Sequence, residues 1–457
     1  MNKMIENFRK NREARRLLYQ SLLSLAIPII IQNLISAMVN SVDVLMLGYV
    51  GQNELSAVSL ANQYAFLLGG FYFGISSGTT LMCSQYWGKQ DVKSIQAVMG
   101  IALKISVTLS TLIGGAAILF APTLMTLYTD DTVLIAIGAR YLRIIGFSYI
   151  CTGFSQVYHC TIRSVERAKL STIIGTIALF TNVILNAVFI FGLLGMPRMG
   201  VVGVAVATVI ARVAEVIICL ADYLKGRVFK PDLRILLGHH KLLLEDFIKY
   251  SLPALINDLA WTVAFSSYSI ILGHMNSDIV AAASVATTIR DMFTTVCYGI
   301  GAAGTVILGK TLGASQFEKA KTDAATLCHI TLTVCAVLGL IMVILRHPIM
   351  SLFTLSPRAA GYLNLMIIIS GYYIIGQGIN TLVIAGVFRA GGDTKFGMIC
   401  DTVTMWVVAV PLGFASAFLF KFPPMVVYFI LCLDEFWKIP AVYMHYKKYN
   451  WVRNITR

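Results

Sequence analysis

The sequence has few charged residues and lacks the motifs of the common enzyme classes. Asp, Glu, Lys and Arg make up only 13% of the chain, against roughly a quarter in a soluble domain. It contains no zinc-protease pattern HExxH, and its one match to the phosphate-binding pattern GxxxxGK followed by Ser or Thr, GTVILGKT at 304–311, lies at the end of a long apolar run and not in a loop between a strand and a helix. We therefore expect no enzyme, no cofactor and no ATPase within the chain.

Paired cysteines are also missing. None of the nine cysteines forms a CxxC pair, and all lie in or beside apolar segments. This distribution is typical of small buried apolar side chains and argues against a disulfide framework or a zinc site. Residues 1–20 are polar and basic, and the apolar stretch after them is too long for a signal h-region, so we expect no cleaved leader.

Apolar residues fill most of the sequence. Hydrophobic residues make up 57% of it and the mean hydropathy is +0.77, values typical of a polytopic membrane protein. A spanning helix needs roughly 20 apolar residues, and twelve segments of about that length or longer follow one another. Their expected bounds are 21–47, 55–82, 94–120, 133–160, 170–192, 201–224, 247–273, 279–309, 317–346, 359–388, 396–420 and 423–446.

The positions of Lys and Arg predict the orientation. Most of the 36 lie in the two termini and in loops on the same side, such as those near Lys89, Lys230 and Arg389. Cytoplasmic segments carry such an excess, so we expect both termini in the cytoplasm and the chain in the cell (inner) membrane. This distribution also accounts for the net charge of +14 without nucleic acid as a partner.

The longest polar connection divides the chain into two halves of six spans. The expected regions are a cytoplasmic lead-in 1–20, an N-lobe 21–224, a cytoplasmic linker 225–246, a C-lobe 247–446 and a cytoplasmic tail 447–457. The halves repeat without a gap over the first two spans, aligning Pro28 with Pro253, Gly48 with Gly273 and Gly88 with Gly313. Because six is even, both halves enter from the same side. Such parallel repeats are common in transporters, with the substrate site between them; a duplicated scaffold without transport is the alternative.

The first span carries an acid within a polar stripe. Asn33, Ser36, Asn40 and Asp43 are three or four residues apart, which places them on one helical face. An ionised carboxylate is costly in hydrocarbon, so an Asp inside a span indicates function. We expect Asp43 to face a protein interior or a wet cavity, and Asn33, Ser36 and Gln63 to line a substrate cavity.

The matching stripe on the seventh span is mostly aromatic. It consists of Asp258, Trp261, Phe265 and Tyr268. Aromatic rings stack on flat organic molecules and attract cations. We therefore expect this stripe to form a second wall of the substrate cavity, although packing alone is the alternative for each ring.

The fifth span adds a pair of amides. Asn182 and Asn186 are four residues apart and share a helical face. With Asp43, Asn40 and Thr208 they are expected to bind a coupling cation, either a proton or a Na⁺ held by Asp43, Asn182 and Asn186. Hydrogen bonding between helices is the alternative role of these amides.

Other charges inside the spans are interpreted as local pairs. Asp401 either pairs with a basic residue or takes part in coupling, and Glu215, three residues after Arg212, predicts an ion pair. Pro28 removes a helix hydrogen bond and either lets the first span bend or only kinks it. The pattern gives no account of Asp434, Glu435 and Lys438.

These residues resemble those of the multidrug and toxic compound extrusion (MATE) family over nearly the whole chain. The resemblance lies in PIIIQNLISAMVNSVDVLMLGYVG with ELSAVSLANQ, in NVILNAVFIFG with GMPRMGVVGVAVAT, and in VFRAGGDT. It implies two six-helix lobes around a central cavity, with Asp43 as the coupling acid and Pro28 as the bending proline. Where one branch of the family has acids on the seventh and tenth helices, this chain has Asp258 and then Gln377 and Asn380, which we assign to the cavity.

We therefore expect an all-α polytopic membrane protein of twelve transmembrane helices. It would be a monomeric secondary antiporter that exports small organic, cationic or amphipathic compounds in exchange for H⁺ or Na⁺. A lipid-linked precursor flippase shares the architecture, but its pyrophosphate needs clustered cations, and the intramembrane cations are scattered: Lys104, Arg140, Arg143 and Arg290. An intramembrane enzyme would need paired acids or His at helical spacing, and none is visible.

Overall fold

The computed structural model describes residues 2–457 except 227–229, 352 and 354, and these described residues form helices and no strand. The first half contains α1 (Asn2–Val50), α2 (Gln52–Gly88), α3 (Val92–Leu119), α4 (Ala121–Thr126), α5 (Thr132–Ser164), α6 (Ala168–Phe191), η1 (Leu193–Gly195), α7 (Gly200–Leu224) and α8 (Leu233–Leu237). The second half contains α9 (Lys241–Gly273), α10 (Ser277–Gly313), α11 (Phe317–Ile344), α12 (Arg346–Met350), α13 (Pro357–Asn380), η2 (Thr381–Phe388), α14 (Thr394–Val403), η3 (Thr404–Ala409), α15 (Val410–Phe414), η4 (Ala415–Leu419), α16 (Pro424–Leu431) and α17 (Asp434–Lys447).

Eleven helices within the described residues are long and apolar enough to cross a membrane. They coincide with eleven of the twelve expected spans, which confirms the all-helical polytopic fold. The expected span 423–446 is interrupted, because α16 ends at Leu431 and α17 begins at Asp434. Asp434 and Glu435 at the start of α17 form hydrogen bonds with side chains of other helices. The sequence pattern of a single segment does not reveal such bonds.

Polar side chains mark where several spans begin. The Asp91 carboxylate accepts a hydrogen bond from the Ser94 amide at the start of α3, and Asp131 does the same for two amides of α5. Asn276 and Ser356 cap α10 and α13. These side chains bond amides that have no partner within their own helix, so the ends of the spans are fixed by short polar side chains in the loops.

The chain forms two compact units. Unit 1 contains Met1–Ile30, Ser84–Lys89 and Lys249–Arg457, and unit 2 contains Ile31–Cys83 and Gln90–Ile248. The units follow the two halves of the sequence except for the beginning of α1 and the end of α2. Helix α1 passes from unit 1 to unit 2 between residues 30 and 31, two residues after Pro28.

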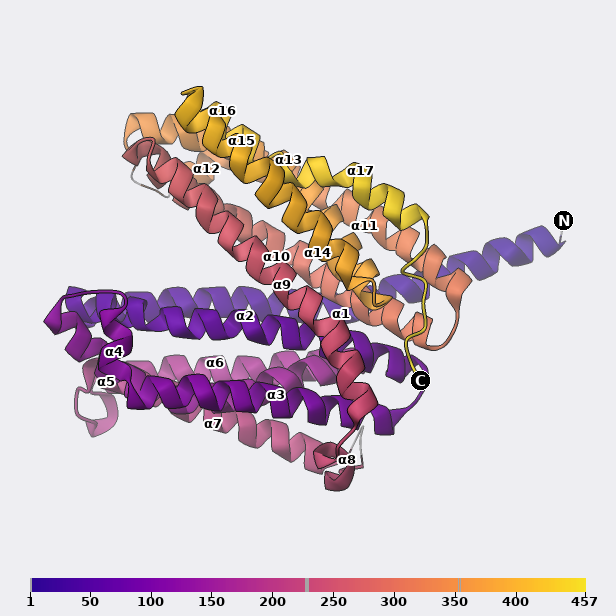
Figure 1. Ribbon diagram of the computed structural model, residues 1–457, viewed down its shortest axis with the longest axis horizontal. Helices are drawn as coiled ribbons and strands as arrows, with labels where there is room; N and C mark the ends of the chain where they lie inside the picture. The colour runs from indigo at the N-terminus through magenta and orange to yellow at the C-terminus, as the bar shows by residue number, and fades with distance from the viewer. Residues whose placement is uncertain (1, 227–229, 352, 354) are drawn as a thin grey trace. The chain divides into compact units, whose positions relative to one another are not determined.

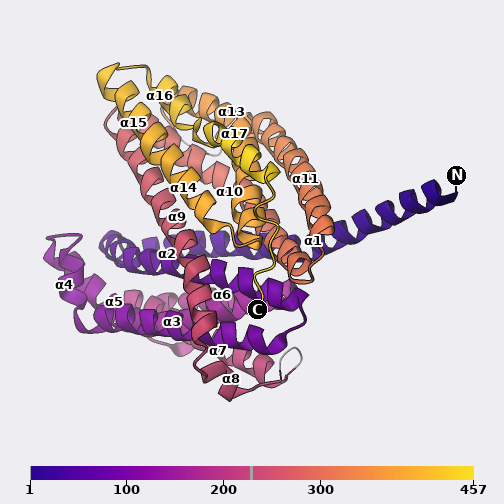
Figure 2. The same cartoon turned by 45° about the vertical axis from the view of Figure 1, so that its right-hand side comes forward.

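Unit 2 is a bundle in which α2, α3, α5, α6 and α7 run alongside one another (Figures 1 and 2). Its core is rich in tyrosine, and the Tyr72 hydroxyl donates to the Tyr149 carbonyl at 2.9 Å. A methyl group on Gly114 of α3 would lie 2.6 Å from the carbonyl oxygen of Gly146 on α5. Only glycine lets these two helices approach so closely.

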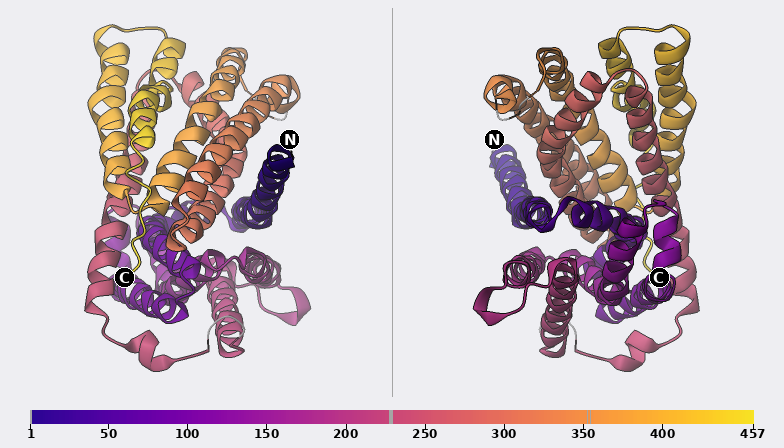
Figure 3. Two further views of the ribbon diagram at one scale, coloured as in Figure 1. Left: turned by 90° about the vertical axis from the view of Figure 1, so that its right-hand side faces the viewer. Right: turned by 90° about the vertical axis from the view of Figure 1, so that its left-hand side faces the viewer.

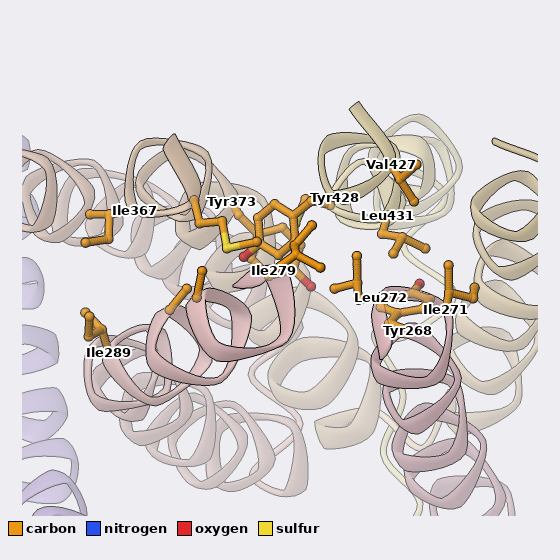
Figure 4. Packing of buried hydrophobic residues seen from close by; sticks show 14 of the residues in the cluster. Tyr268, Ile271, Leu272, Ile279, Ile289, Ile367, Tyr373, Val427, Tyr428 and Leu431 are labelled. Carbon is orange, nitrogen blue, oxygen red and sulfur yellow. The ribbon is translucent and has the colours of Figure 1, made fainter. Parts of the chain in front are cut away.

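Unit 1 is built in the same way. Its helices from α10 to α17 lie side by side in two opposite views (Figure 3). The core contains Tyr268, Tyr373 and Tyr428, whose side chains gather with aliphatic residues between α9, α10, α13 and α16 (Figure 4). A methyl group on Gly339 of α11 would overlap the carbonyl oxygen of Gly371 on α13. This crossing corresponds to that of Gly114 and Gly146 in unit 2.

The glycine contacts extend the sequence repeat. A methyl group on Gly88, at the end of α2, would overlap the Lys310 carbonyl, and one on Gly313, at the end of α10, would overlap the Gln85 carbonyl. Gly88 and Gly313 are equivalent in the repeat, so each contacts the helix of the other in a reciprocal way.

Candidate functional site

Asp43 lies on the part of α1 that belongs to unit 2, and α6 supplies its hydrogen-bond donor. The Asn186 side-chain nitrogen donates to Asp43 Oδ1 at 2.9 Å. The Asp43 carboxyl is half-buried, whereas Asn186 is only 1% exposed. The predicted association of the first-span acid with the fifth-span amide is therefore present in the structure.

The hydrogen bonds continue from Asp43 to α7. Asn186 also donates to Asn182 Oδ1 at 3.3 Å, and the Asn182 nitrogen donates to Thr208 Oγ1 at 3.1 Å. The hydroxyl of Thr208 donates in turn to the Val204 carbonyl at 2.9 Å. Three helices thus present one carboxylate, two amide oxygens and one hydroxyl to a single cluster, which we call the Asp43 cluster (Asp43, Asn182, Asn186 and Thr208).

Two features of the Asp43 cluster suit a small cation. The Oδ1 atom of Asn186 is buried and has no hydrogen-bond partner among the described residues, so an acceptor next to the carboxylate is unsatisfied. Asp43 has no ion pair among the salt bridges of the same part of the chain. Buried acceptors are normally paired and buried charges are normally neutralised. A proton or a Na⁺ between these oxygens would meet both requirements.

Arg212 and Tyr141 lie near Asp43, and neither was predicted from the sequence to belong to this site. The Arg212 guanidinium of α7 and the Tyr141 ring of α5 both interact electrostatically with Asp43. Tyr141 donates to Asn62 Oδ1 of α2 at 3.1 Å. The signal for Arg212 was present in the sequence, since it is one helical turn after Thr208.

Four expected residues of the first two spans lie outside these hydrogen bonds. Asn33, Asn40 and Gln63 are exposed, and none of them takes part in the hydrogen bonds of the Asp43 cluster. Ser36 is half-buried and donates to the Gln32 carbonyl of its own helix at 2.8 Å. Asn33, Ser36 and Gln63 remain predicted cavity residues, and Asn40 remains a predicted coupling residue.

The expected residues of the seventh span lie in unit 1. Asp258 pairs with Arg389, whose nitrogen lies 2.9 Å from Oδ1. Trp261, Phe265 and Tyr268 stack in series, with ring centroids 4.2 and 5.2 Å apart. All three rings contact the core of unit 1, so they pack against one another and against aliphatic side chains.

Arg290 approaches the same rings. Its guanidinium lies 5.5 Å from the Phe265 centroid and 5.0 Å from that of Tyr373, and its Nε lies 4.0 Å from Asp291. Lys104 instead donates to the carbonyls of Leu237 and Gly238 in unit 2. Lys104 and Arg290 thus have separate partners, each within its own unit.

A buried charge cluster surrounds the break between α16 and α17. The Lys438 ammonium lies 2.8 Å from Asp401 and 3.1 Å from Glu435, and Asn380 donates to Glu435 at 2.8 Å. Asp434 is fully buried and accepts from the Tyr268 hydroxyl at 3.4 Å. Gln377 lies apart and donates to Tyr298 at 3.3 Å. The expected pair of Asp401 with a base is confirmed, and its base is Lys438.

Comparisons with known proteins agree with this architecture. The family model described as MatE matches residues 28–188 and 253–415. The uncharacterized transporter YisQ of Bacillus subtilis is 24% identical over 434 residues, covering 95% of each chain. The multidrug resistance protein PmpM of Pseudomonas aeruginosa is 25% identical over 406 residues, covering 87% of this chain and 83% of that protein.

Solved structures share the fold. A crystal structure of MATE in the bent conformation gives a TM-score of 0.86 at 17% identity, with 95% of both chains covered. At this identity the likeness shows the arrangement of the helices and no more.

Proposed function

Since the chain belongs to the MatE family of multidrug efflux transporters, we propose that it is a secondary antiporter. It exports small organic cations or amphipathic compounds in exchange for inward H⁺ or Na⁺. One observation carries the proposal: the Asp43 carboxylate forms no ion pair within the described residues and lies beside the unsatisfied oxygen of Asn186. A carboxylate that served only structure would be expected in a permanent ion pair, as Asp258 and Asp401 are.

Asp43 binds and releases the coupling ion in this proposal. Binding neutralises the carboxylate and supplies the missing partner of Asn186, which changes how α1 packs on α6. Because α1 passes between the two units just after Pro28, a change in its packing at Asp43 is transmitted along the helix toward unit 1. Proline removes a helix hydrogen bond and lets the helix bend there.

The two halves act as lobes in this proposal, and the substrate site opens alternately to either side of the membrane. Asn33 and Gln63 offer exposed polar groups to the substrate from unit 2, and Asn40 stays a predicted coupling residue. Trp261 and Phe265 offer partly exposed rings from unit 1, and such rings attract organic cations. We propose that both termini are cytoplasmic and that the chain works as a monomer in the cell membrane.

The coupling ion decides what the Asp43 cluster must provide. Protonation needs only the carboxylate and a nearby acceptor, whereas Na⁺ needs several oxygen ligands at once. The amide oxygens of Asn182 and Asn186 and the hydroxyl of Thr208 are available for either role. A flux assay at fixed pH, with and without Na⁺, separates the two ions.

The test of the proposal is gradient-driven export in liposomes that contain the purified chain. The unmodified chain should drive export of a fluorescent organic cation when a H⁺ or Na⁺ gradient is applied. Asp43→Asn should abolish coupled export, because the amide cannot be protonated or carry charge, while membrane insertion stays intact. Asp130→Asn, which removes an exposed acid in a loop, is the matched control and should export normally.

Export by Asp43→Asn at the rate of the unmodified chain would remove Asp43 from the mechanism. Absence of gradient-driven export by the unmodified chain, with every tested cation, would contradict antiport itself.

A further inference from the structure

A second titratable cluster lies in unit 2, and the proposed antiport mechanism does not use it. His159 on α5 bonds Glu215 on α7 through Nε2 at 2.9 Å and Ser171 on α6 through Nδ1 at 2.9 Å. The His159 and Glu215 side chains are 5% and 4% exposed. The second oxygen of Glu215 accepts from Arg212 at 2.8 Å, which confirms the pair expected from the sequence.

The partners of His159 fit both of its protonation states. In the neutral ring, Nε2–H donates to Glu215 and the Ser171 hydroxyl donates to Nδ1. In the protonated ring, Nδ1–H donates to Ser171 Oγ instead, and the hydroxyl turns away, since a hydroxyl rotates freely between donor and acceptor roles. A helical serine commonly bonds the carbonyl four residues before it. His159 can therefore gain or lose a proton without leaving a ring nitrogen unpaired.

Arg212 connects this cluster with Asp43. Its guanidinium bonds Glu215 and also interacts electrostatically with Asp43. Asp43 and Glu215 bring two negative charges and Arg212 brings one positive charge. One additional proton, on either Asp43 or His159, makes the group neutral. Two protons would leave an excess positive charge in a low-dielectric region, which is costly.

Other titratable and charged groups surround His159. Arg163 of α5 donates to the His159 carbonyl at 3.3 Å, and Arg167 pairs with Asp222 at 3.2 Å. Two thiols lie near Glu215, those of Cys151 on α5 and Cys219 on α7. The carboxylate that faces the His159 ring is that of Glu215.

We propose that His159 is a second proton-binding site of unit 2, which takes up the proton that Asp43 releases and passes it toward the cytoplasmic side. His159 precedes the end of α5 by five residues, and Ser171 follows the start of α6 by three, so the cluster lies at the α5–α6 end of the bundle. This inference rests on the proposed antiport, with H⁺ as the coupling ion and the α5–α6 loop in the cytoplasm.

The test is the pH profile of export by the full chain in liposomes. Free histidine titrates near pH 6.5 and is the residue that changes charge between about pH 5 and 8. His159→Gln keeps an amide that donates to Glu215 but cannot take up a proton. We expect this variant to lose the pH dependence of export within that range. We also expect its rate to fall by about tenfold or more, since positioned acid–base groups contribute at least that much.

Two further measurements separate a proton-binding role from a structural one. Affinity for the fluorescent cation at a fixed pH should stay unchanged in His159→Gln, because the ring is buried and is not one of the predicted cavity residues. Ser171→Ala keeps the His159–Glu215 bond and removes only the partner of Nδ1, so it should displace the pH profile along the pH axis without abolishing the pH dependence and without destabilising the protein.

The outcomes are distinct from those of the antiport test. If the unmodified chain exports and His159→Gln keeps the same pH profile, the inference is wrong and the antiport proposal stands. A rate that falls equally at every pH in both variants would also contradict it, since that is the result expected of a purely structural histidine. Absence of export by the unmodified chain would instead contradict the proposed function.

Discussion

At the scale of single residues, buried charged side chains are the positions where a substitution is expected to destabilise the protein most. Lys438 is 3% exposed and compensates two buried carboxylates, those of Asp401 and Glu435. Removing one partner of a buried pair costs more than the pair contributes, because the remaining charge stays in a low-dielectric interior.

Lys438→Met should therefore destabilise the protein by about 3–5 kcal/mol. The measurement is thermal unfolding of the purified chain in detergent. Lys448→Met, at an exposed position just after α17, is the control and should leave the unfolding temperature unchanged. Equal unfolding temperatures for both variants would show that Lys438 does not neutralise Asp401 and Glu435.

The residue scale also shows what the sequence can reveal about the site. Helical spacing predicted that Asn182 and Asn186 share a face, and the polar stripe pointed to Asp43. His159 and Lys438 were not interpreted, because Glu215 and Asp401 lie 56 and 37 positions away on other helices. A pattern within one span contains no signal for a partner on another span.

At the scale of helices, close crossings decide the packing. The α3–α5 crossing places Gly114 against the Gly146 carbonyl, whereas a methyl group on the neighbouring Gly115 would meet no atom within 4 Å among the described residues. The two adjacent glycines thus differ only in the side of α3 that they occupy.

Gly114→Ala should destabilise unit 2 by about 1–3 kcal/mol, since overpacking forces helices apart. Gly115→Ala is the matched control and should be neutral or slightly stabilising, because alanine favours helix more than glycine does. Thermal unfolding of both variants tests the difference. A smaller effect at position 114 than at position 115 would contradict the close crossing.

The starts of α3 and α5 were predictable, because a capping Asp comes directly before each helix: Asp91 before α3 and Asp131 before α5. The interruption between α16 and α17 was not predictable, because Cys432 and Leu433 continue the apolar run. Asp434 and Glu435, which begin α17, bond side chains of other helices, and local sequence does not show such bonds.

At the scale of the whole chain, the last residues close unit 1. The expected tail 447–457 packs onto unit 1, with Trp451 fully buried. Gln85 joins it to distant segments, because it donates to Ala390 at 2.7 Å and to Arg453 at 3.2 Å and accepts from the Ile455 amide at 2.8 Å.

Gln85→Ala should loosen this segment, since the variant loses three hydrogen bonds worth roughly 1 kcal/mol each. Limited trypsin digestion followed by mass spectrometry should detect faster cleavage after Arg453. The control Gln52→Ala, at the exposed start of α2, should be cleaved at the original rate. Unchanged cleavage in Gln85→Ala would show that the segment is held without this amide.

The reciprocal contacts of Gly88 and Gly313 have a consequence for the origin of the chain. Each glycine makes room for the other helix at an equivalent position, as the same residue would in two identical copies facing each other. A six-span ancestor could therefore have paired with itself through this glycine before the gene was duplicated and fused. Fusion then freed the two halves to diverge, which left the acid-and-amide cluster in one half and the aromatic stripe in the other.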